Sequence, residues 1–111
     1  MAHFMLRWQL TAAAAKALVA RPQDRTVQAT TLFEGFGGKL LQYFFTFGEY
    51  DGLAICEFPD ATAVAACSMA ASATGAFSRF ETVSLLTAKE AETAMQVARA
   101  AKIGGYSPPN V

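Results

Sequence analysis

Apolar and polar residues alternate along the first stretch of the chain, from His3 to Leu10. This alternation is the period of a β-strand whose two faces differ. One face would carry Phe4, Leu6, Trp8 and Leu10, and the other would carry His3, Met5, Arg7 and Gln9. We therefore expect the first strand here.

A helical pattern follows in two pieces. Thr11 can N-cap an alanine-rich segment, which Pro22 then interrupts. Beyond Pro22, the side chains from Val27 to Phe36 recur at helical spacing until Gly37-Gly38 ends the segment. The sequence therefore predicts two helical segments with a kink or loop near Arg21-Pro22.

Two apolar runs, Leu40–Phe47 and Leu53–Phe58, flank the turn sequence Gly48-Glu49-Tyr50-Asp51 and predict a β-hairpin. A type II′ turn with Gly48 and Glu49 at its centre would require a positive φ at Gly48. It would pair Phe47 with Tyr50, Phe45 with Gly52, Tyr43 with Ala54 and Leu41 with Cys56. The alternative turn at Asp51-Gly52 would draw Pro59 into the ladder, where its missing N–H is unfavourable. We therefore prefer the Gly48 turn.

The two faces of this hairpin are both apolar enough to be buried. One carries Tyr43, Phe45, Ala54 and Cys56, and the other carries Phe44, Leu53, Ile55 and Glu57. We assign the face with Leu53 and Ile55 to the helices, since these side chains suit a core. The aromatic face would then meet a second copy of the chain, because Tyr and Phe are favoured at interfaces.

The rest of the chain adds a helix, a strand and a last helix. Asp60 can cap an alanine-rich helix that ends near Thr74 and Gly75, and Phe77–Leu86 is the expected fourth strand. A capping box, Thr87 to Glu90, opens a helix to about Lys102. The order is β-α-β-β-α-β plus a C-terminal helix, which predicts an α+β, ferredoxin-like domain over residues 1–103. Residues 104–111 would form an extended or disordered tail.

Composition adds an expectation about assembly. The chain is 53% hydrophobic and only 16% charged, against about 25% charged residues in an average soluble domain. A four-stranded sheet with helices on one face also leaves its other face to be covered. We therefore expect a homo-oligomer that is at least a dimer.

Charge and cysteine content argue against several classes of protein. Nine basic and nine acidic residues give a formal net charge of zero, without a basic cluster, so we expect no nucleic-acid partner. No apolar run approaches the ~18 residues of a membrane span, and Arg7 and Gln9 interrupt what could be the core of a signal peptide. Cys56 and Cys67 have neither metal spacing nor a disulfide framework, so we interpret them as buried free thiols in the cytoplasm. We expect no metal and no cofactor.

Charged and polar residues in the strands are the candidates for a site. Arg7 lies in the middle of the first strand, and Arg79 and Glu81 lie on the fourth. These two strands are neighbours in the ferredoxin-like order, so Arg7 can pair with Glu81, either as a structural ion pair or as part of an anion clamp. His3 is the only histidine, which leaves it as a lone general base or as a residue without a chemical role.

Several short motifs carry a family resemblance. Gly37-Gly38-Lys39-Leu40, Thr46 to Asp51, Ala54-Ile55, and Glu57 ahead of Pro59-Asp60 resemble the GYD domain family of small bacterial proteins. The resemblance implies a ferredoxin-like fold that pairs into a dimeric α/β barrel, and the family has no agreed activity. Tyr50 and Asp51 are its namesake residues. They either fix the hairpin, with Asp51 accepting backbone N–H bonds, or face a ligand at the mouth of the barrel.

Two hypotheses for function follow. The first is an oligomeric protein that is structural or binds a small apolar molecule, since no nucleophile–base or metal constellation is present. The second is a cofactor-free oxygenase or isomerase for a small apolar or aromatic substrate. It is suggested by analogy with other dimeric α/β barrels and by the possible group His3, Arg7, Tyr43 and Tyr50. The candidate ligand-binding residues are His3, Arg7, Tyr43, Tyr50, Asp51 and Arg79.

Overall fold

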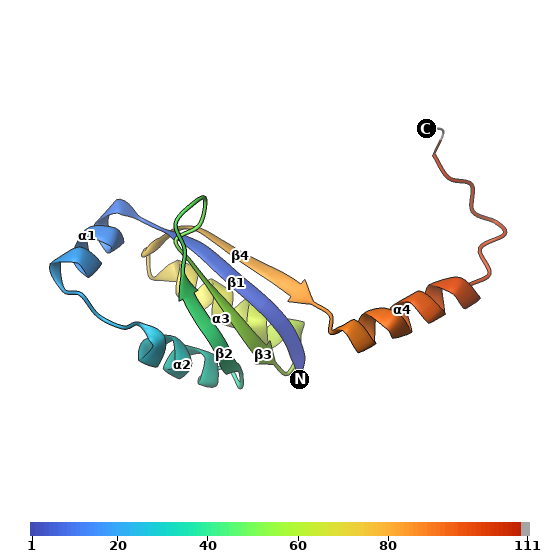
Figure 1. The fold of residues 1–111 in the computed structure, drawn as a ribbon, viewed down its shortest axis with the longest axis horizontal. Helices are drawn as coiled ribbons and strands as arrows, with labels where there is room; N and C mark the ends of the chain where they lie inside the picture. The colour runs from blue at the N-terminus through green and yellow to red at the C-terminus, as the bar shows by residue number, and fades with distance from the viewer. Residues whose placement is uncertain (110–111) are drawn as a thin grey trace.

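The computed structural model describes residues 1–109 and places four antiparallel strands in one sheet, in the order β2-β3-β1-β4. Along the chain the elements are β1 (Ala2–Leu10), α1 (Ala12–Ala20), α2 (Thr26–Glu34), β2 (Lys39–Phe45), β3 (Gly52–Phe58), α3 (Ala61–Ala73), β4 (Phe77–Leu85) and α4 (Ala88–Ala100). Figure 1 shows α3 behind the sheet, α1 and α2 at one end, and α4 leaving the opposite end. The ferredoxin-like prediction is confirmed, with the first crossover divided into two helices.

The predicted helix caps are present. The Thr11 hydroxyl accepts a hydrogen bond from the Ala14 N–H at 3.2 Å, and the Asp60 carboxylate accepts one from the Ala63 N–H at 2.8 Å. At the start of α4, Glu90 and Thr87 form both hydrogen bonds of the capping box. These local bonds satisfy backbone N–H groups that a helix leaves free at its start.

The core lies between the sheet and the helices α2 and α3. The strands contribute Phe4, Leu6, Trp8, Ala54, Cys56 and Phe58, and the helices contribute Phe33, Val64, Cys67 and Ala71. Cys56 and Cys67 are free and buried, as predicted, and burial raises the pKa of these thiols to about 12 and about 11. Neither thiol is ionised or reactive near neutral pH.

The assignment of the hairpin faces was wrong. The helices cover the face that carries Ala54 and Cys56, whereas Leu53 and Ile55 lie on the other face. The reason is the pairing with β1, in which Leu6 lies opposite Ala54 and Phe4 opposite Cys56. Residues opposite each other share a face, so the strongly apolar face of β1 decides the orientation, and the small side chains on β3 leave room for α3.

The hairpin turn also differs from the prediction. Phe45 pairs with Gly52 and Tyr43 with Ala54 as expected, but a bulge places Leu40 opposite Cys56. The strands are joined by a loop over residues 46–51, and Gly48 has no positive φ, which excludes the type II′ turn. Two long-range hydrogen bonds hold the last residue of this loop, Asp51, against β1. The Asp51 N–H donates to the Trp8 carbonyl at 2.8 Å, and the Asp51 carboxylate accepts the Leu10 N–H at 2.7 Å.

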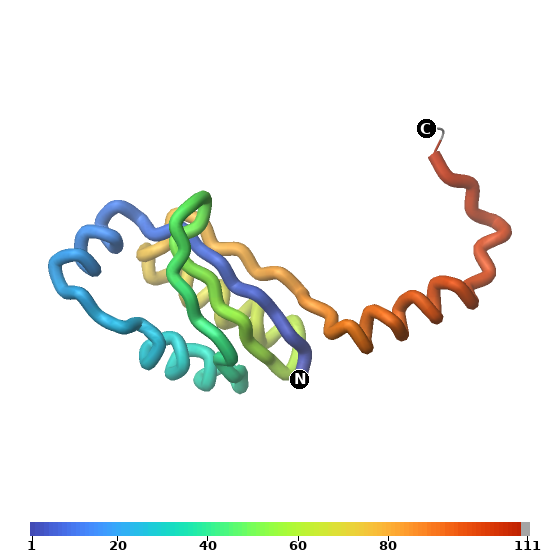
Figure 2. The backbone as a smooth tube through the Cα atoms, in the orientation of Figure 1, coloured from blue at the N-terminus to red at the C-terminus, as the bar shows by residue number. Residues whose placement is uncertain are grey.

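Two apolar surfaces remain uncovered within residues 1–109. The first is the sheet face opposite the helices, which we call the open face; Met5, Ile55 and Val83 form a row across three of its strands. The second is α4, which extends away from the domain (Figure 2) and has no buried residue. The radius of gyration is 18.0 Å, against about 13 Å for a compact domain of this length. The described part of the predicted tail, residues 104–109, contains only a turn at Gly104-Gly105.

A single glycine allows the close contact between β3 and the tryptophan. A Cβ atom on Gly52 would lie 2.6 Å from the Trp8 ring, whereas one on Gly48 would have no neighbour within 4 Å. We predict that Gly52→Ala lowers the free energy of unfolding by about 1–3 kcal/mol through overpacking. Gly48→Ala, the matched control, should change it by less than about 0.5 kcal/mol. Urea unfolding of both variants tests this, and equal stabilities would contradict the packing described.

Candidate functional site

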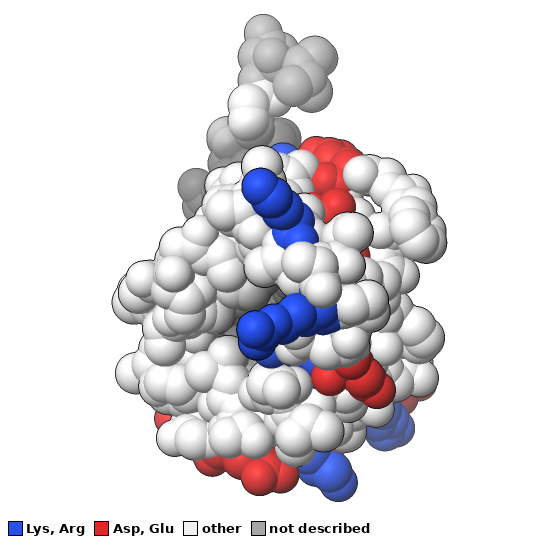
Figure 3. Space-filling view, turned by 90° about the vertical axis from the view of Figure 1, so that its left-hand side faces the viewer, with Lys and Arg blue, Asp and Glu red and all other residues white. Residues whose placement is uncertain are grey.

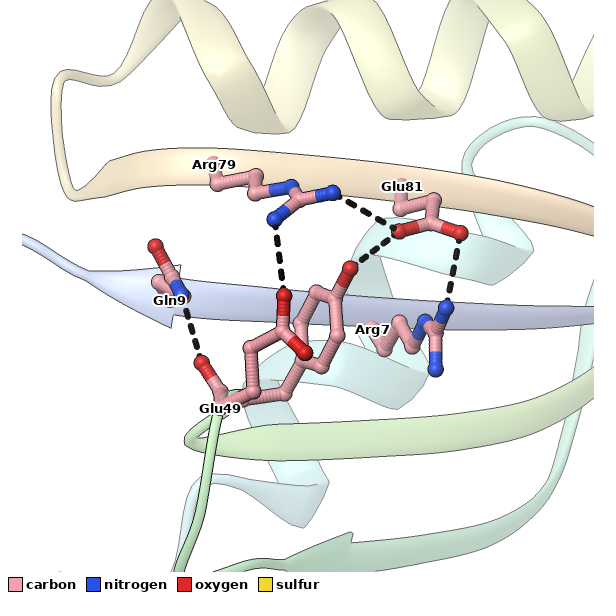
Figure 4. Close-up of polar contacts among 6 residues, drawn as sticks. Arg7, Gln9, Glu49, Arg79 and Glu81 are labelled. Carbon is pink, nitrogen blue, oxygen red and sulfur yellow. Dashed lines mark hydrogen bonds and ion pairs between the residues drawn. The ribbon is translucent and has the colours of Figure 1, made fainter.

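A polar cluster occupies the open face near the hairpin loop (Figure 4). Tyr50, from the loop, lies over the sheet with its ring centroid 4.1 Å from the Arg7 guanidinium carbon and 5.3 Å from that of Arg79. Its hydroxyl donates a hydrogen bond to Glu81. Although it is a loop residue, Tyr50 is only 9% exposed. We call Arg7, Glu49, Tyr50, Arg79 and Glu81 the Tyr50 cluster.

Alternating charges hold the cluster together. Arg7 donates to Glu81 at 2.9 Å, and the two residues lie opposite each other on β1 and β4. This confirms the predicted pairing. The guanidinium nitrogens of Arg79 lie 3.1 Å from a carboxylate oxygen of Glu49 and 3.8 Å from one of Glu81. The Gln9 side-chain amide donates to the Glu49 backbone carbonyl. Each carboxylate of the cluster therefore faces an arginine.

The same contacts fix the protonation states. The hydrogen bond from Arg7, followed by that from Tyr50, lowers the pKa of Glu81 below its ordinary value. The bond to Glu81 in turn raises the pKa of Tyr50, since the carboxylate holds the phenolic proton. Tyr50 is thus a neutral hydrogen-bond donor and is poorly suited to act as a base near neutral pH.

One donor of the cluster remains free. The Nε of Arg7 is buried and has no hydrogen-bond partner among the described residues. A hollow of about 240 Å³ lies beside it, lined by Met5, Arg7, Leu53 and residues 46–50 of the loop. Its volume falls below the roughly 300–1,000 Å³ of typical ligand pockets. The anion clamp considered for Arg7 has a donor here but little room.

The structure separates the remaining candidate residues from the cluster. Asp51 binds the backbone of β1, as described above, which agrees with its structural interpretation. His3 lies near the other end of β1, opposite Glu57 and Leu85. Tyr43 lies on the helix-covered face, with its ring centroid 5.5 Å from that of Trp8. Arg7, Tyr50 and Arg79 are therefore the predicted site residues that meet.

A larger cavity, of about 470 Å³, lies between the sheet and the helices α1, α2 and α3; we call it the aromatic cavity. Its rings come from Trp8, Phe33, Tyr43, Phe45, Phe77 and Phe80. Figure 3, which views the end of the molecule where α1 and α2 lie, shows a hollow among mostly uncharged residues with a basic side chain at its edge. Burial raises the pKa of Tyr43, so its hydroxyl stays protonated.

Among these residues, only Tyr43 was a predicted ligand-binding residue, and it was placed on the face of the sheet away from the helices. A signal was available, because β1 and β4 are neighbours in the ferredoxin-like order and Trp8 pairs with Phe80. That pairing brings the aromatic side chains of two strands together on the apolar face of β1. Within residues 1–109, no group of His, Cys, Asp and Glu side chains is arranged to hold a metal ion, and no helix is long and apolar enough to cross a membrane.

The depressed pKa of Glu81 makes stability depend on pH. A carboxylate whose pKa is lower in the folded state stabilises the fold above its ordinary pKa of 4.5, and this contribution is lost as pH falls through the folded pKa. We predict that Glu81→Gln loses less stability than wild type between about pH 6 and about pH 3. The control is Glu92→Gln, whose carboxylate pairs with Lys89 on the surface of α4. Urea unfolding at each pH, at one protein concentration, measures the difference; parallel curves for Glu81→Gln and wild type would refute it.

Comparison with known proteins identifies the family. The model of the GYD domain matches residues 4–95, which run from β1 into α4 and include both the Tyr50 cluster and the strands of the aromatic cavity. A search of curated proteins found no match. The fold, the hairpin loop and the family match agree, and the chain belongs to the GYD domain family.

Proposed function

We propose that this protein is a cytoplasmic homo-oligomer that binds a small, largely apolar molecule in the aromatic cavity. The observation that carries the proposal is the cavity itself. Its volume of about 470 Å³ lies within the range of small-molecule sites, which are apolar clefts with a few polar groups. Its polar groups include Tyr43, Gln28 and Thr74.

The walls of the cavity differ in how firmly they are held. Trp8 and Phe33 belong to the buried core, which fixes one side. On the other side, α1 contributes Ala14, Ala17 and Leu18, and α1 has no buried residue. An element with little buried surface opens at low free-energy cost, so α1 provides a route for a ligand to enter.

Two uncovered apolar surfaces, the open face and α4, support the proposed oligomer. The open face exposes apolar rows, and α4 presents a stripe of Ala91, Ala94, Met95 and Ala98 at helical spacing. A 13-residue helix is marginally stable alone in water. A second copy supplies a matching apolar surface for both, which is the pairing that a dimeric α/β barrel would use.

Within this assembly we assign the Tyr50 cluster a structural role. Its charges are already paired inside one chain, so burial against a partner leaves no carboxylate without an arginine. A paired polar cluster inside an apolar interface favours one register over others. The buried free thiols of Cys56 and Cys67 agree with a reducing compartment.

We prefer ligand binding to catalysis as the function of this protein. The group suggested for an oxygenase or isomerase, His3, Arg7, Tyr43 and Tyr50, is divided between two faces of the sheet and two ends of β1. Tyr50 holds its proton against Glu81. Tyr43 remains a candidate ligand-binding residue because it lines the aromatic cavity.

The first test concerns assembly. Sedimentation at micromolar concentration should give at least twice the 11.8 kDa mass of the chain. Ile55→Glu on the open face and Ala94→Glu on the α4 stripe should shift the protein toward monomer, since each buries a charge in the interface. Gln96→Glu adds the same charge to the polar side of α4 and should leave the mass unchanged. A monomeric wild type would refute the oligomer, and unchanged mass in a folded variant would refute the role of that surface.

The second test concerns the cavity, and it uses the single tryptophan of the chain, Trp8, which lines it. The neutral dye N-phenyl-1-naphthylamine should bind saturably and quench Trp8 emission by energy transfer. Ala29→Phe, which fills the cavity from α2, should weaken binding at least tenfold. Val27→Phe adds a similar ring to an exposed position of the same helix and serves as control. Equal binding by both variants would place the dye elsewhere.

A further inference from the structure

We infer that the natural ligand of the aromatic cavity is a planar aromatic anion, with its ring system against Trp8 and its acidic group at Arg25. This inference rests on the proposed function of the cavity and names the chemical class of its ligand. It is drawn from the charge at the rim and from the geometry of the rings.

The charge at the cavity is one-sided. Arg25 is the only charged side chain among the described residues that line it. The guanidinium donates to the Gln23 side chain at 2.8 Å, and no ion pair with Arg25 is found within residues 1–109. The nearest acid in sequence, Asp24, does not line the cavity, and its carboxylate accepts the Thr26 N–H at 2.8 Å. Arg25 therefore has hydrogen-bond donors available for an anion.

Arg25 also acts on the interior of the cavity. Burial is the largest influence on the pKa of Tyr43 and raises it; the positive charge of Arg25 lowers this pKa, and the negative charge of Asp24 raises it with a smaller effect. Arg25 is half-buried and immediately precedes α2, and the Asp24 carboxylate already accepts the Thr26 N–H at the start of that helix. The Arg25 guanidinium is therefore the charge that lines the cavity, and it would repel a cationic ligand and attract an anion.

The rings define the shape of the ligand. Trp8 and Phe80 are nearly parallel, with an interplanar angle of 15° and centroids 6.1 Å apart. Phe77 meets Phe80 edge to face at 5.2 Å, and Tyr43 is tilted by 42° against Trp8. Flat walls of this kind favour offset stacking and edge contacts with another aromatic ring. A volume of about 470 Å³ accommodates a molecule of two or three rings.

Two dyes of the same skeleton test the inference. 8-Anilinonaphthalene-1-sulfonate carries a sulfonate that N-phenyl-1-naphthylamine lacks, and Trp8 reports both by energy transfer. We expect wild type to bind the sulfonate dye more tightly than the neutral dye. Arg25→Met should weaken binding of the sulfonate dye about tenfold and change binding of the neutral dye less than about twofold. Arg21→Met removes a neighbouring positive charge that does not line the cavity, and it should leave both affinities unchanged.

The outcomes separate the inference from the proposed function. If Arg25→Met binds both dyes as wild type does, or if Arg21→Met weakens the sulfonate dye equally, the anion site is overturned while the cavity stands. If neither dye quenches Trp8 in wild type, the small-molecule function itself fails. Two results together support the aromatic anion. A folded Arg25→Met variant selectively loses affinity for the sulfonate dye, and added salt lowers the affinity of wild type for this dye.

Discussion

The contact of Trp8 with Gly52, together with the two hydrogen bonds of the adjacent Asp51 to β1, positions both the aromatic cavity and the Tyr50 cluster. Because Gly52 has no side chain, the tryptophan ring lies directly over β3 and reaches Tyr43 on one side and Phe80 on the other. Because Asp51 is bound to the backbone of Trp8 and Leu10, the hairpin loop is drawn over the end of β1. This places the preceding residue, Tyr50, above Arg7 on the open face. Three consecutive residues therefore position the aromatic cavity on one side of the sheet and the polar cluster on the other.

The two faces have different chemistry for a physical reason. On the helix side, large rings surround a space that the small residues of α1 do not fill, so apolar surface is available to a ligand. On the open side, apolar rows surround a cluster whose charges are already paired. The Tyr50 cluster loses little when a partner covers it, because each of its carboxylates already faces an arginine. The proposed ligand site and the proposed oligomer interface therefore lie on opposite faces of one sheet.

Much of the fold could be predicted from the sequence because its signals are local. The N-caps at Thr11 and Asp60, the capping box at Thr87 and the alternation of β1 depend on residues a few positions apart. The pairing of Arg7 with Glu81 followed from strand order alone.

The hairpin turn could not be obtained in this way, since its geometry depends on bonds from Asp51 to a distant strand. The hairpin faces were misassigned because both are apolar, and only their pairing with β1 distinguishes them. The aromatic cavity was missed because its rings come from three strands and one helix, which meet only in the folded chain.

The composition of the chain is explained by what one copy leaves uncovered. A chain that is 53% hydrophobic has more apolar surface than a sheet with two packed helices can bury. In this structure the excess lies on the open face and along α4, which has a complete capping box but no buried residue. Caps and the surface pair between Lys89 and Glu92 stabilise a helix only slightly. The proposed oligomer explains the persistence of α4 as a helix in water, because the open face of a second copy is an apolar surface that this sequence itself provides.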